Sequence, residues 1–216
     1  MTVTPGSSDY WDKRYSDVGW REVSWFQEVP EPSMSLVQDA VQLNAQQGTN
    51  SQGKHAAIVD VGGGASLLVD ALINDGFTNV TVIDVSDAAI ATARERVHNN
   101  HATFITADVR EWKPAQLFDV WHDRAAYHFL TDHHDQQRYW QTVRANLKAN
   151  GTLIIATFAE DGPEMCSGLP IQRYSPDERI EAMGEGFEVT QTLRHSHTTP
   201  SGGEQKFIWV IAKRVA

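Results

Sequence analysis

Aspartate recurs at the ends of three successive apolar segments of the chain. Asp60 stands two residues before a run of three glycines, and Asp84 and Asp108 end the next two segments. If the segments are parallel strands, their carboxyl ends meet at one edge of a sheet, where ligands bind in such folds. A single aspartate is weak evidence, because aspartate is common in turns and caps. Its ordered recurrence beside a glycine turn indicates a ligand site.

The glycine turn narrows the choice of ligand. Gly62 and Gly64 match the first two glycines of a dinucleotide fingerprint, but the third would fall at Leu67, whose bulk opposes close packing of helix on strand. Asp60 would also repel a pyrophosphate and attract a ligand that carries ammonium and sulfonium charges. Asp84, 22 positions after Gly62, is spaced to accept from ribose hydroxyls. Asp108 could accept from an adenine amino group. The pattern favours S-adenosylmethionine (SAM).

Strands and helices alternate from residue 55 onward, which predicts parallel pairing with right-handed crossovers. Strands are expected at 55–61, 79–85, 102–109, 117–123 and 151–159, and helices at 66–76, 86–99 and 131–148. The segments 187–195 and 204–214 flank a Pro-Ser-Gly-Gly loop, which predicts a hairpin. The expected fold is an α/β, Rossmann-like, doubly wound and mostly parallel seven-stranded sheet with a terminal antiparallel hairpin.

The first 54 residues are expected to form a helical extension to this domain, which itself spans 55–216. The stretch 9–29 contains three of the seven tryptophans, and the stretch 31–46 has the apolar spacing of a helix. Amphipathic aromatic side chains suit two roles equally well: a lid over a ligand, or a flap that only packs on the domain. The domain organisation is therefore a lid extension at 1–54 followed by a SAM-binding domain, with the structural flap as the alternative.

Composition excludes several classes of function. The chain has 28 acidic and 18 basic residues, a net charge of −10, which disfavours nucleic acid and anionic membranes as partners. Cys166 is its single cysteine, so neither an intramolecular disulfide nor a cysteine cluster for zinc can form. No apolar stretch is long enough to span a membrane. These features predict a cytoplasmic protein without a metal site.

Residues 55–214 resemble the class I SAM-dependent methyltransferases. The motifs YWDKRY, SWF, NVTVIDVS, ADVREW and FDVWHD are more specifically similar to the group that contains the elongation-factor-1-alpha lysine methyltransferases. By this resemblance, the residues expected to contact the cofactor are Trp11, Tyr15, Gly62, Asp84, Val85, Asp108, Val109 and Arg124. In members of the group, Gly-Thr usually follows the acidic-basic pair that corresponds to Asp123 and Arg124, whereas this chain has Ala125 and Ala126. The resemblance therefore does not identify the methyl acceptor of this chain.

Methyl transfer from a sulfonium mainly requires a nucleophile held about 3 Å from the methyl group, with water excluded. A base helps only if the nucleophile arrives protonated. His122 and Asp123, at the end of the fourth expected strand, are candidates for that role. For His128, His133 and His134 we also consider a packing or helix-start role, and no ligand spacing suggests a metal.

The aperiodic stretch 160–174 is long for a connection in such a fold, and we expect it to line the acceptor site. Cys166, Arg173 and Tyr174 are its most reactive side chains, and Cys166 could instead be a small buried apolar residue. The expected acceptor is a small molecule such as a thiol. A protein lysine and a SAM-binding module without catalysis remain as alternatives.

Overall fold

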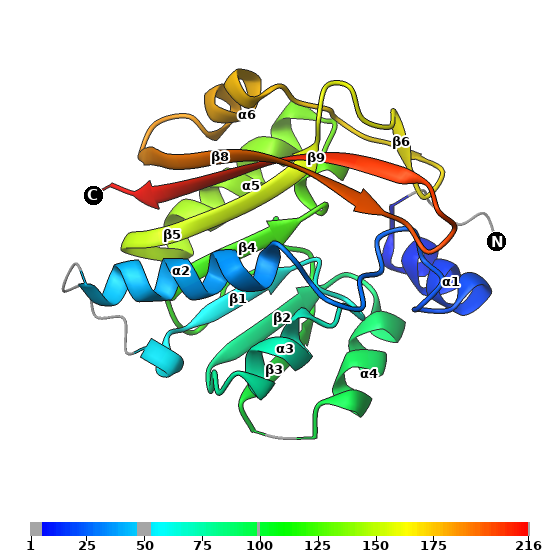
Figure 1. Ribbon diagram of the computed structural model, residues 1–216, viewed down its shortest axis with the longest axis horizontal. Helices are drawn as coiled ribbons and strands as arrows, with labels where there is room; N and C mark the ends of the chain where they lie inside the picture. The colour runs from blue at the N-terminus through cyan, green and yellow to red at the C-terminus, as the bar shows by residue number, and fades with distance from the viewer. Residues whose placement is uncertain (1–5, 47–52, 99, 216) are drawn as a thin grey trace.

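The computed structural model describes residues 6–46, 53–98 and 100–215. Its centre is a seven-stranded sheet in the order β3-β2-β1-β4-β5-β9-β8 (Figure 1). Neighbours among the first five strands pair in parallel, and β9 is antiparallel to both β5 and β8. The expected fold class is therefore confirmed. The strands are β1 (Ile58–Val61), β2 (Val80–Asp84), β3 (Ala102–Thr106), β4 (Phe118–Arg124), β5 (Leu147–Phe158), β8 (Phe187–Thr198) and β9 (Glu204–Arg214).

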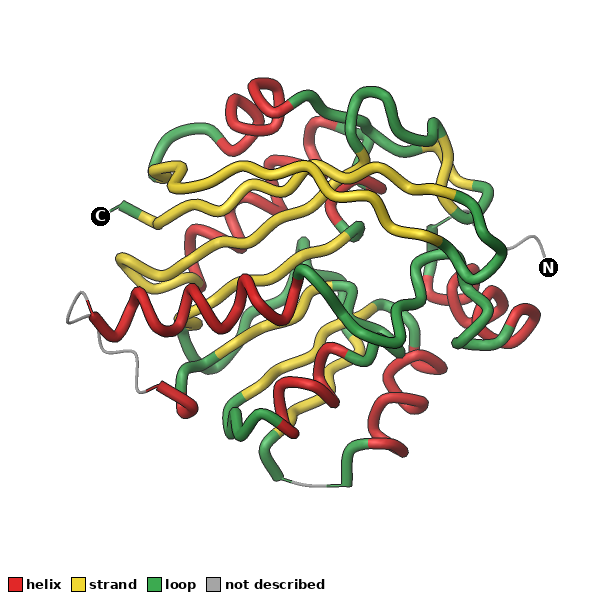
Figure 2. The backbone as a smooth tube through the Cα atoms, in the orientation of Figure 1, coloured by secondary structure: helices red, strands yellow, loops and turns green. Residues whose placement is uncertain are grey.

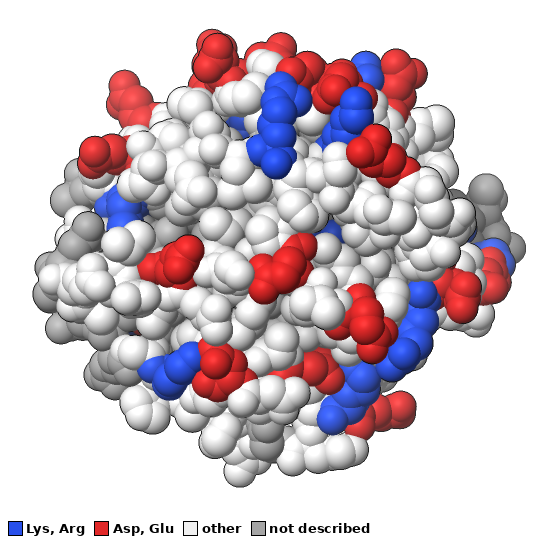
Figure 3. Space-filling model, in the orientation of Figure 1, with Lys and Arg blue, Asp and Glu red and all other residues white. Residues whose placement is uncertain are grey.

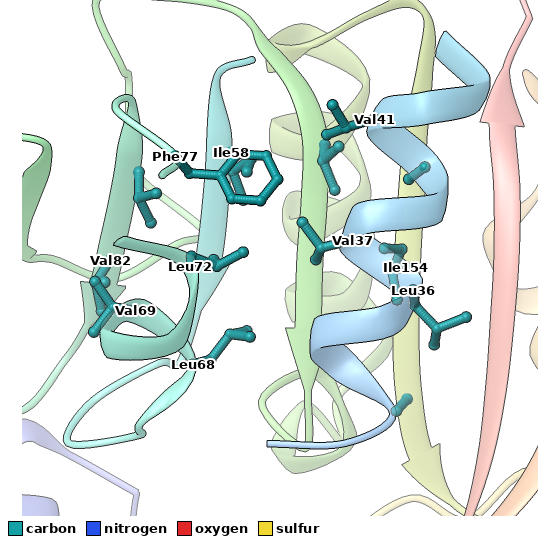
Figure 4. Close-up of a cluster of buried hydrophobic side chains, with 14 of the residues drawn as sticks. Leu36, Val37, Val41, Ile58, Leu68, Val69, Leu72, Phe77, Val82 and Ile154 are labelled. Atoms are coloured by element: carbon teal, nitrogen blue, oxygen red, sulfur yellow. The ribbon is translucent and has the colours of Figure 1, made fainter. Parts of the chain in front are cut away.

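Helices cover both faces of the sheet because strand side chains alternate between two apolar layers. On one face, α2 and α3 pack on alternate strand residues such as Ile58 and Ile154 (Figure 4). On the other face, α5 and α6 cover the intervening residues, among them Val59 and Ile155. The helices are α1 (Ser8–Val18), α2 (Ser33–Gln46), α3 (Leu68–Asn74), α4 (Asp87–Arg96), α5 (His133–Asn146) and α6 (Pro176–Met183).

Side-chain caps set the helix starts. Ser86 accepts from the backbone N–H of Ala89, and α4 therefore begins one residue after it. Asp132 caps α5, which places the helix start two residues after the expected Thr131, and a short 3₁₀ turn, η2 (Tyr127–Phe129), precedes it. A second 3₁₀ turn, η1 (Gly53–His55), leads into β1.

The stretch 160–174 contains a small two-stranded sheet of β6 (Met165–Cys166) and β7 (Leu169–Pro170). The sequence pattern predicts an irregular stretch here, so the paired strands are a difference from expectation. The short hairpin stands at the carboxyl edge of the main sheet, close to α1 (Figure 1).

The N-terminal segment divides into one helix and one loop. Helix α1 is capped by Ser7, ends at Gly19 with φ of +82°, and packs against α4. From there to α2 the chain runs as a loop beside the hairpin of β8 and β9 (Figure 2), where Ser24 accepts from the His197 imidazole and Gln205. Within the described part of the chain, no helix is both long and apolar enough to cross a membrane.

Candidate active site

A cavity of about 450 Å³ lies at the carboxyl ends of β1, β2, β3 and β4, between the sheet and α1. It is lined by Gly6, Ser7, Ser8, Trp11, Tyr15, Trp25, Val61, Gly62, Ile83, Asp84, Val85, Thr106, Ala107, Asp108, Val109, Arg110, Arg124, Ala125, Ala126, Phe129, Leu130, Tyr139 and Cys166. Eight residues expected to contact the cofactor thus meet around one space: Trp11, Tyr15, Gly62, Asp84, Val85, Asp108, Val109 and Arg124. Asp60 and Gly64, also expected there, lie behind this lining.

The glycine turn brings bare backbone to the cavity. Gly62 has φ of +65°, and a Cβ on it would lie 2.6 Å from the Cβ of Ala126. A Cβ on Gly64 would lie 2.7 Å from the Tyr15 hydroxyl and 2.9 Å from Oδ2 of Asp84. Any side chain at either position would occupy space that the turn shares with its neighbours. The structure therefore explains why glycine stands at these two positions.

Asp84 ends β2 at the cavity wall. Its Oδ1 accepts from the backbone N–H of Ser86 at 2.9 Å. Burial, together with the negative charges of Asp60 and Asp12, raises the pKa of Asp84 to about 6. At neutral pH the side chain is a carboxylate that water solvates poorly, and such a group gains strongly from ligand hydroxyls that donate to it.

Asp108, in contrast, already has a cationic partner. Arg110 donates to it from its backbone N–H and from its guanidinium, with a shortest distance of 2.5 Å, and also pairs with Asp135. Burial opposes ionisation of Asp108, but the hydrogen bonds from Arg110 outweigh it and lower its pKa. The sequence pattern predicts an adenine amino group as the partner of this carboxylate, whereas the structure pairs it with Arg110, from which it is separated by one residue.

Aromatic side chains enclose the end of the cavity beneath α1. The Trp11 ring centroid lies 5.0 Å from that of Phe129 and 5.9 Å from that of Trp25, and Tyr15 meets Trp25 at 5.9 Å. All three contacts are edge-to-face, the favourable arrangement for such pairs. Trp11 and Tyr15 of α1 therefore belong to the cavity wall, as the lid interpretation expects.

Arg124 ends β4 within this wall. Its Nη2 donates to the Trp25 carbonyl at 2.8 Å, whereas its buried Nη1 has no hydrogen-bond partner among the described residues. Burial lowers the pKa of this guanidinium. A buried donor without a partner is costly, so Arg124 is suited to an anionic group of a ligand in the cavity.

His122 does not reach the cavity. It is 2% exposed, and both of its ring nitrogens have partners: Nδ1 lies 2.7 Å from Oδ1 of Asp60, and Nε2 lies 2.9 Å from the Ser33 hydroxyl. The expectation that His122 is a base for the acceptor needs a correction, because strand alternation turns the imidazole beneath α2 and away from the lining.

Asp123 is also buried outside the lining. It accepts from the backbone N–H groups of Ala126 and Tyr127 and from the Tyr139 hydroxyl at 2.7 Å. These bonds hold the turn that follows Arg124, where Ala125 has φ of +69°. Asp123 therefore shapes the cavity wall from behind, which corrects its expected role beside the acceptor.

The remaining histidines lie outside the lining as well. His128 is buried, and burial followed by the charge of Arg124 lowers its pKa to about 3, so it is a neutral ring between Phe129 and Phe158. His133 and His134 are exposed in the first turn of α5.

Only one reactive residue of the stretch 160–174 meets the cavity, which corrects the expectation for the whole stretch. Cys166 lines it, and burial raises the pKa of its thiol to about 11. Arg173 instead donates to the Gly162 carbonyl and pairs with Glu164, and Tyr174 packs beside Tyr127. The hairpin approaches the site because β6 and β7 are tied to α1, where Tyr10 donates to the Ser167 carbonyl at 2.5 Å.

Known proteins share this architecture. Residues 58–151 match a family described as "Methyltransferase domain". The chain is 23% identical over 204 residues to EEF1A lysine methyltransferase 2 of Danio rerio, covering 87% of this chain and 78% of that protein.

Two solved structures superpose on most of the chain. One, described as "Conversion of a Disulfide Bond into a Thioacetal Group during Echinomycin Biosynthesis", has a TM-score of 0.71 at 16% identity and covers 96% of this chain and 91% of its own. The other is 1,6-didemethyltoxoflavin-N1-methyltransferase from Burkholderia thailandensis with bound 1,6-didemethyltoxoflavin and S-adenosylhomocysteine. Its TM-score is 0.67 at 16% identity, with 100% and 94% of the two chains covered.

Proposed function

The chain is a class I SAM-dependent methyltransferase, and on that premise we propose that it methylates a small nucleophile, such as a thiol, that enters the cavity already deprotonated. Because the chain is an enzyme of this class, the alternative of a SAM-binding module without catalysis is set aside.

The cavity residues fit the cofactor. The Asp84 carboxylate is suited to accept from the ribose hydroxyls, and the bare backbone at Gly62 allows a close approach of the ligand. The unpartnered Nη1 of Arg124 is suited to the carboxylate of the methionine part, and Val85 and Val109 offer apolar contact to the adenine. When bound, SAM supplies a methyl group on a sulfonium, whose sulfur leaves as a neutral thioether.

The observation that carries the proposal is the protonation of the groups around the cavity. Burial raises the pKa of Tyr139, whose hydroxyl donates to Asp123, and raises that of Cys166 to about 11. Burial also raises the pKa of Tyr15. At neutral pH these three side chains keep their protons and cannot act as a base, and the two carboxylates of the lining have other partners: Asp108 is paired with Arg110, and Asp84 is assigned here to the ribose. A nucleophile that arrives as an anion or with a free lone pair needs no base.

The size of the cavity supports a small acceptor. About 450 Å³ must hold both cofactor and acceptor, and this volume is near the lower end of the range for ligand pockets. The aromatic rings of Trp11, Trp25 and Phe129 form an apolar wall of this space, which would help to exclude water once the ligands are bound.

A protein lysine is the second candidate. It is favoured by the similarity over 204 residues to EEF1A lysine methyltransferase 2 and by the net charge of −10, which would attract a basic segment. Acidic and basic side chains are interspersed on the face in Figure 3, so that face does not mark out an acidic docking area. A lysine ammonium would also have to lose a proton before it attacks.

The test is transfer of a labelled methyl group from SAM to a panel of thiols, amines and proteins over a range of pH. For two thiols with different pKa values, we expect each rate to rise about tenfold per pH unit below the thiol's own pKa and to level off above it. With SAM at saturating concentration, an inflection at one fixed pH above 7 for both thiols would reveal a base on the enzyme, since the titration of Asp84 lies near pH 6. Label found on protein lysines alone would favour the second candidate.

A further inference from the structure

Ser33, His122 and Asp60 form a buried hydrogen-bonded chain behind the glycine turn. Their exposed fractions are 1%, 2% and 3%, and the imidazole lies 2.9 Å from the serine hydroxyl and 2.7 Å from the carboxylate. This chain is not a nucleophilic triad, since none of the three residues lines the cavity. A buried carboxylate is nevertheless costly and requires an explanation.

The fold itself brings the three residues together. Asp60 of β1 and His122 of β4 are direct partners in the parallel register. Strand alternation places both on the face of Ile58 and Val120, which is the face that α2 covers. Ser33 is the first residue of α2, so the start of that helix meets the imidazole.

The chemistry of the partners fixes the proton on the imidazole. An ionised carboxylate can only accept, so Nδ1 of His122 carries the hydrogen that is donated to Asp60. Nε2 is then an acceptor for the hydroxyl of Ser33. In this arrangement both ring nitrogens of His122 have partners, and the imidazole holds Oδ1 of Asp60 in place.

That charge lies directly against the cofactor turn. A Cβ at Gly63 would be 2.5 Å from Oδ2 of Asp60, so the carboxylate fills the space beneath the turn. Its negative charge acts on two residues of the cavity wall. It contributes to the raised pKa of Asp84, and it favours the charged form of Arg124, whose pKa burial lowers. A cation bound between Asp84 and Arg124 would therefore be attracted by Asp60.

We propose that His122 is a positioning residue which, held by Ser33, keeps the Asp60 carboxylate directed at the glycine turn, so that the site favours the sulfonium of SAM over the uncharged sulfur of its product. The inference rests on the SAM site and is independent of the acceptor.

The test compares SAM and S-adenosylhomocysteine (SAH) binding by calorimetry. In His122→Gln, the amide stands near the place of Nε2 and loses the bond to Asp60, and we expect SAM to bind about tenfold more weakly, with a smaller loss for SAH. In His122→Asn, the amide stands near the place of Nδ1, and we expect most of the wild-type preference to return. Asp60→Asn should lower the SAM-to-SAH preference as His122→Gln does, because it removes the charge directly.

His197→Gln is the matched control, since His197 is also a buried histidine with a hydrogen bond, to the Ser24 carbonyl. It should leave the preference unchanged. Thermal unfolding of each variant without ligand separates binding from stability. If His122→Gln does not fold, Ser33→Ala should lower the preference in the same direction.

Equal losses of SAM and SAH affinity in Asp60→Asn would overturn the inference, because the carboxylate would then only support the shape of the turn. Equal affinities in His122→Gln and His122→Asn would overturn it as well, as would an unchanged preference in Ser33→Ala where that variant is needed. Absence of SAM binding in the wild-type protein would instead contradict the proposed function. The two failures are therefore distinguishable.

Discussion

Asp12 of α1 accepts a hydrogen bond of 2.6 Å from the hydroxyl of Ser86, the residue that caps α4. It also accepts from the backbone N–H of Ala88 at 3.1 Å, so its charge lies at the positive end of the α4 dipole. Ser86 in turn donates its backbone N–H to Asp84. The α1 helix and the residue proposed to hold the ribose are therefore joined through one serine.

The first prediction concerns this link. Asp12→Ala should weaken SAM binding about 5- to 30-fold, since it releases α1 from α4 and loosens the cavity wall formed by Trp11 and Tyr15. Isothermal titration calorimetry measures the change. Asp17→Ala is the control, because Asp17 forms only an exposed ion pair with Lys13. Equal affinity in both variants would show that α1 is a structural flap.

The second prediction separates binding from stability at Asp84. Asp84→Asn should bind SAM about 10- to 100-fold more weakly, because a charged acceptor for the ribose is lost. Without ligand it should unfold about 2–6 °C higher at pH 8.

The sign follows from the raised pKa of Asp84, which is about 6 in the folded protein. Above pH 6 the carboxylate is charged in both states, and the folded state bears the cost of its burial. As the pH falls from 6 towards 4, the folded protein takes up a proton before the unfolded chain does, and the wild type gains stability. The advantage of Asp84→Asn should therefore shrink between pH 8 and pH 4, and thermal unfolding at several pH values measures it. A constant difference would contradict the assignment.

The third prediction tests the packing of the glycine turn. Gly62→Ala should destabilise the fold by about 1–3 kcal/mol, since its Cβ would lie 2.6 Å from that of Ala126 at a φ of +65°. Adding Ala126→Gly should recover the packing part of this loss and leave the backbone part. Gly76→Ala is a control for the backbone part alone, because Gly76 has φ of +92° and a Cβ there would meet no atom within 4 Å. Urea unfolding measures the stability of Gly62→Ala, Ala126→Gly, the double variant and Gly76→Ala. If the effects of Gly62→Ala and Ala126→Gly were strictly additive in the double variant, the close contact would be contradicted.

The fourth prediction is that the Cys166 thiol resists alkylation. With a pKa of about 11 in place of 9.0, its thiolate fraction at pH 8 is about 100-fold lower. The rate of reaction with iodoacetamide should be at least about 100-fold lower in the folded protein than in urea, and should rise about tenfold per pH unit up to pH 10. Reaction at the rate of the unfolded chain would show that the thiol is accessible and has an ordinary pKa, and a faster reaction would show that it is activated. In either case Cys166 would return as a candidate for direct participation.

Sequence reasoning located the parts of the site that depend on local pattern. Asp84 ends β2 as predicted, whereas β3 ends at Thr106 and Asp108 lies two residues beyond it. Both positions follow from the regular spacing of the apolar segments, and the cap at Ser86 follows from residue type. Helix α6 was missed, although Ser175 and Glu178 form a capping box whose spacing is readable in the sequence. The sequence pattern therefore indicates those features, such as strand segments and helix caps, that residues close together in the sequence determine.

Contacts between distant segments were not predictable in the same way. His122 was expected to face the acceptor, but its orientation depends on strand alternation and on Ser33, which is 89 residues away. The hydrogen bond from Arg124 to the Trp25 carbonyl joins residues that are 99 positions apart in the sequence. Only the assembled sheet determines which strand residues point into the cavity and which point beneath α2.

The tie between Tyr10 and Ser167 spans 157 residues. Closing a loop of this length costs conformational entropy, which the contacts around the tie must offset. Helix α1 completes the cavity wall only when both α4 and the hairpin near residue 167 are in place, so cofactor binding would report on the assembly of three distant segments and not on the formation of the sheet alone.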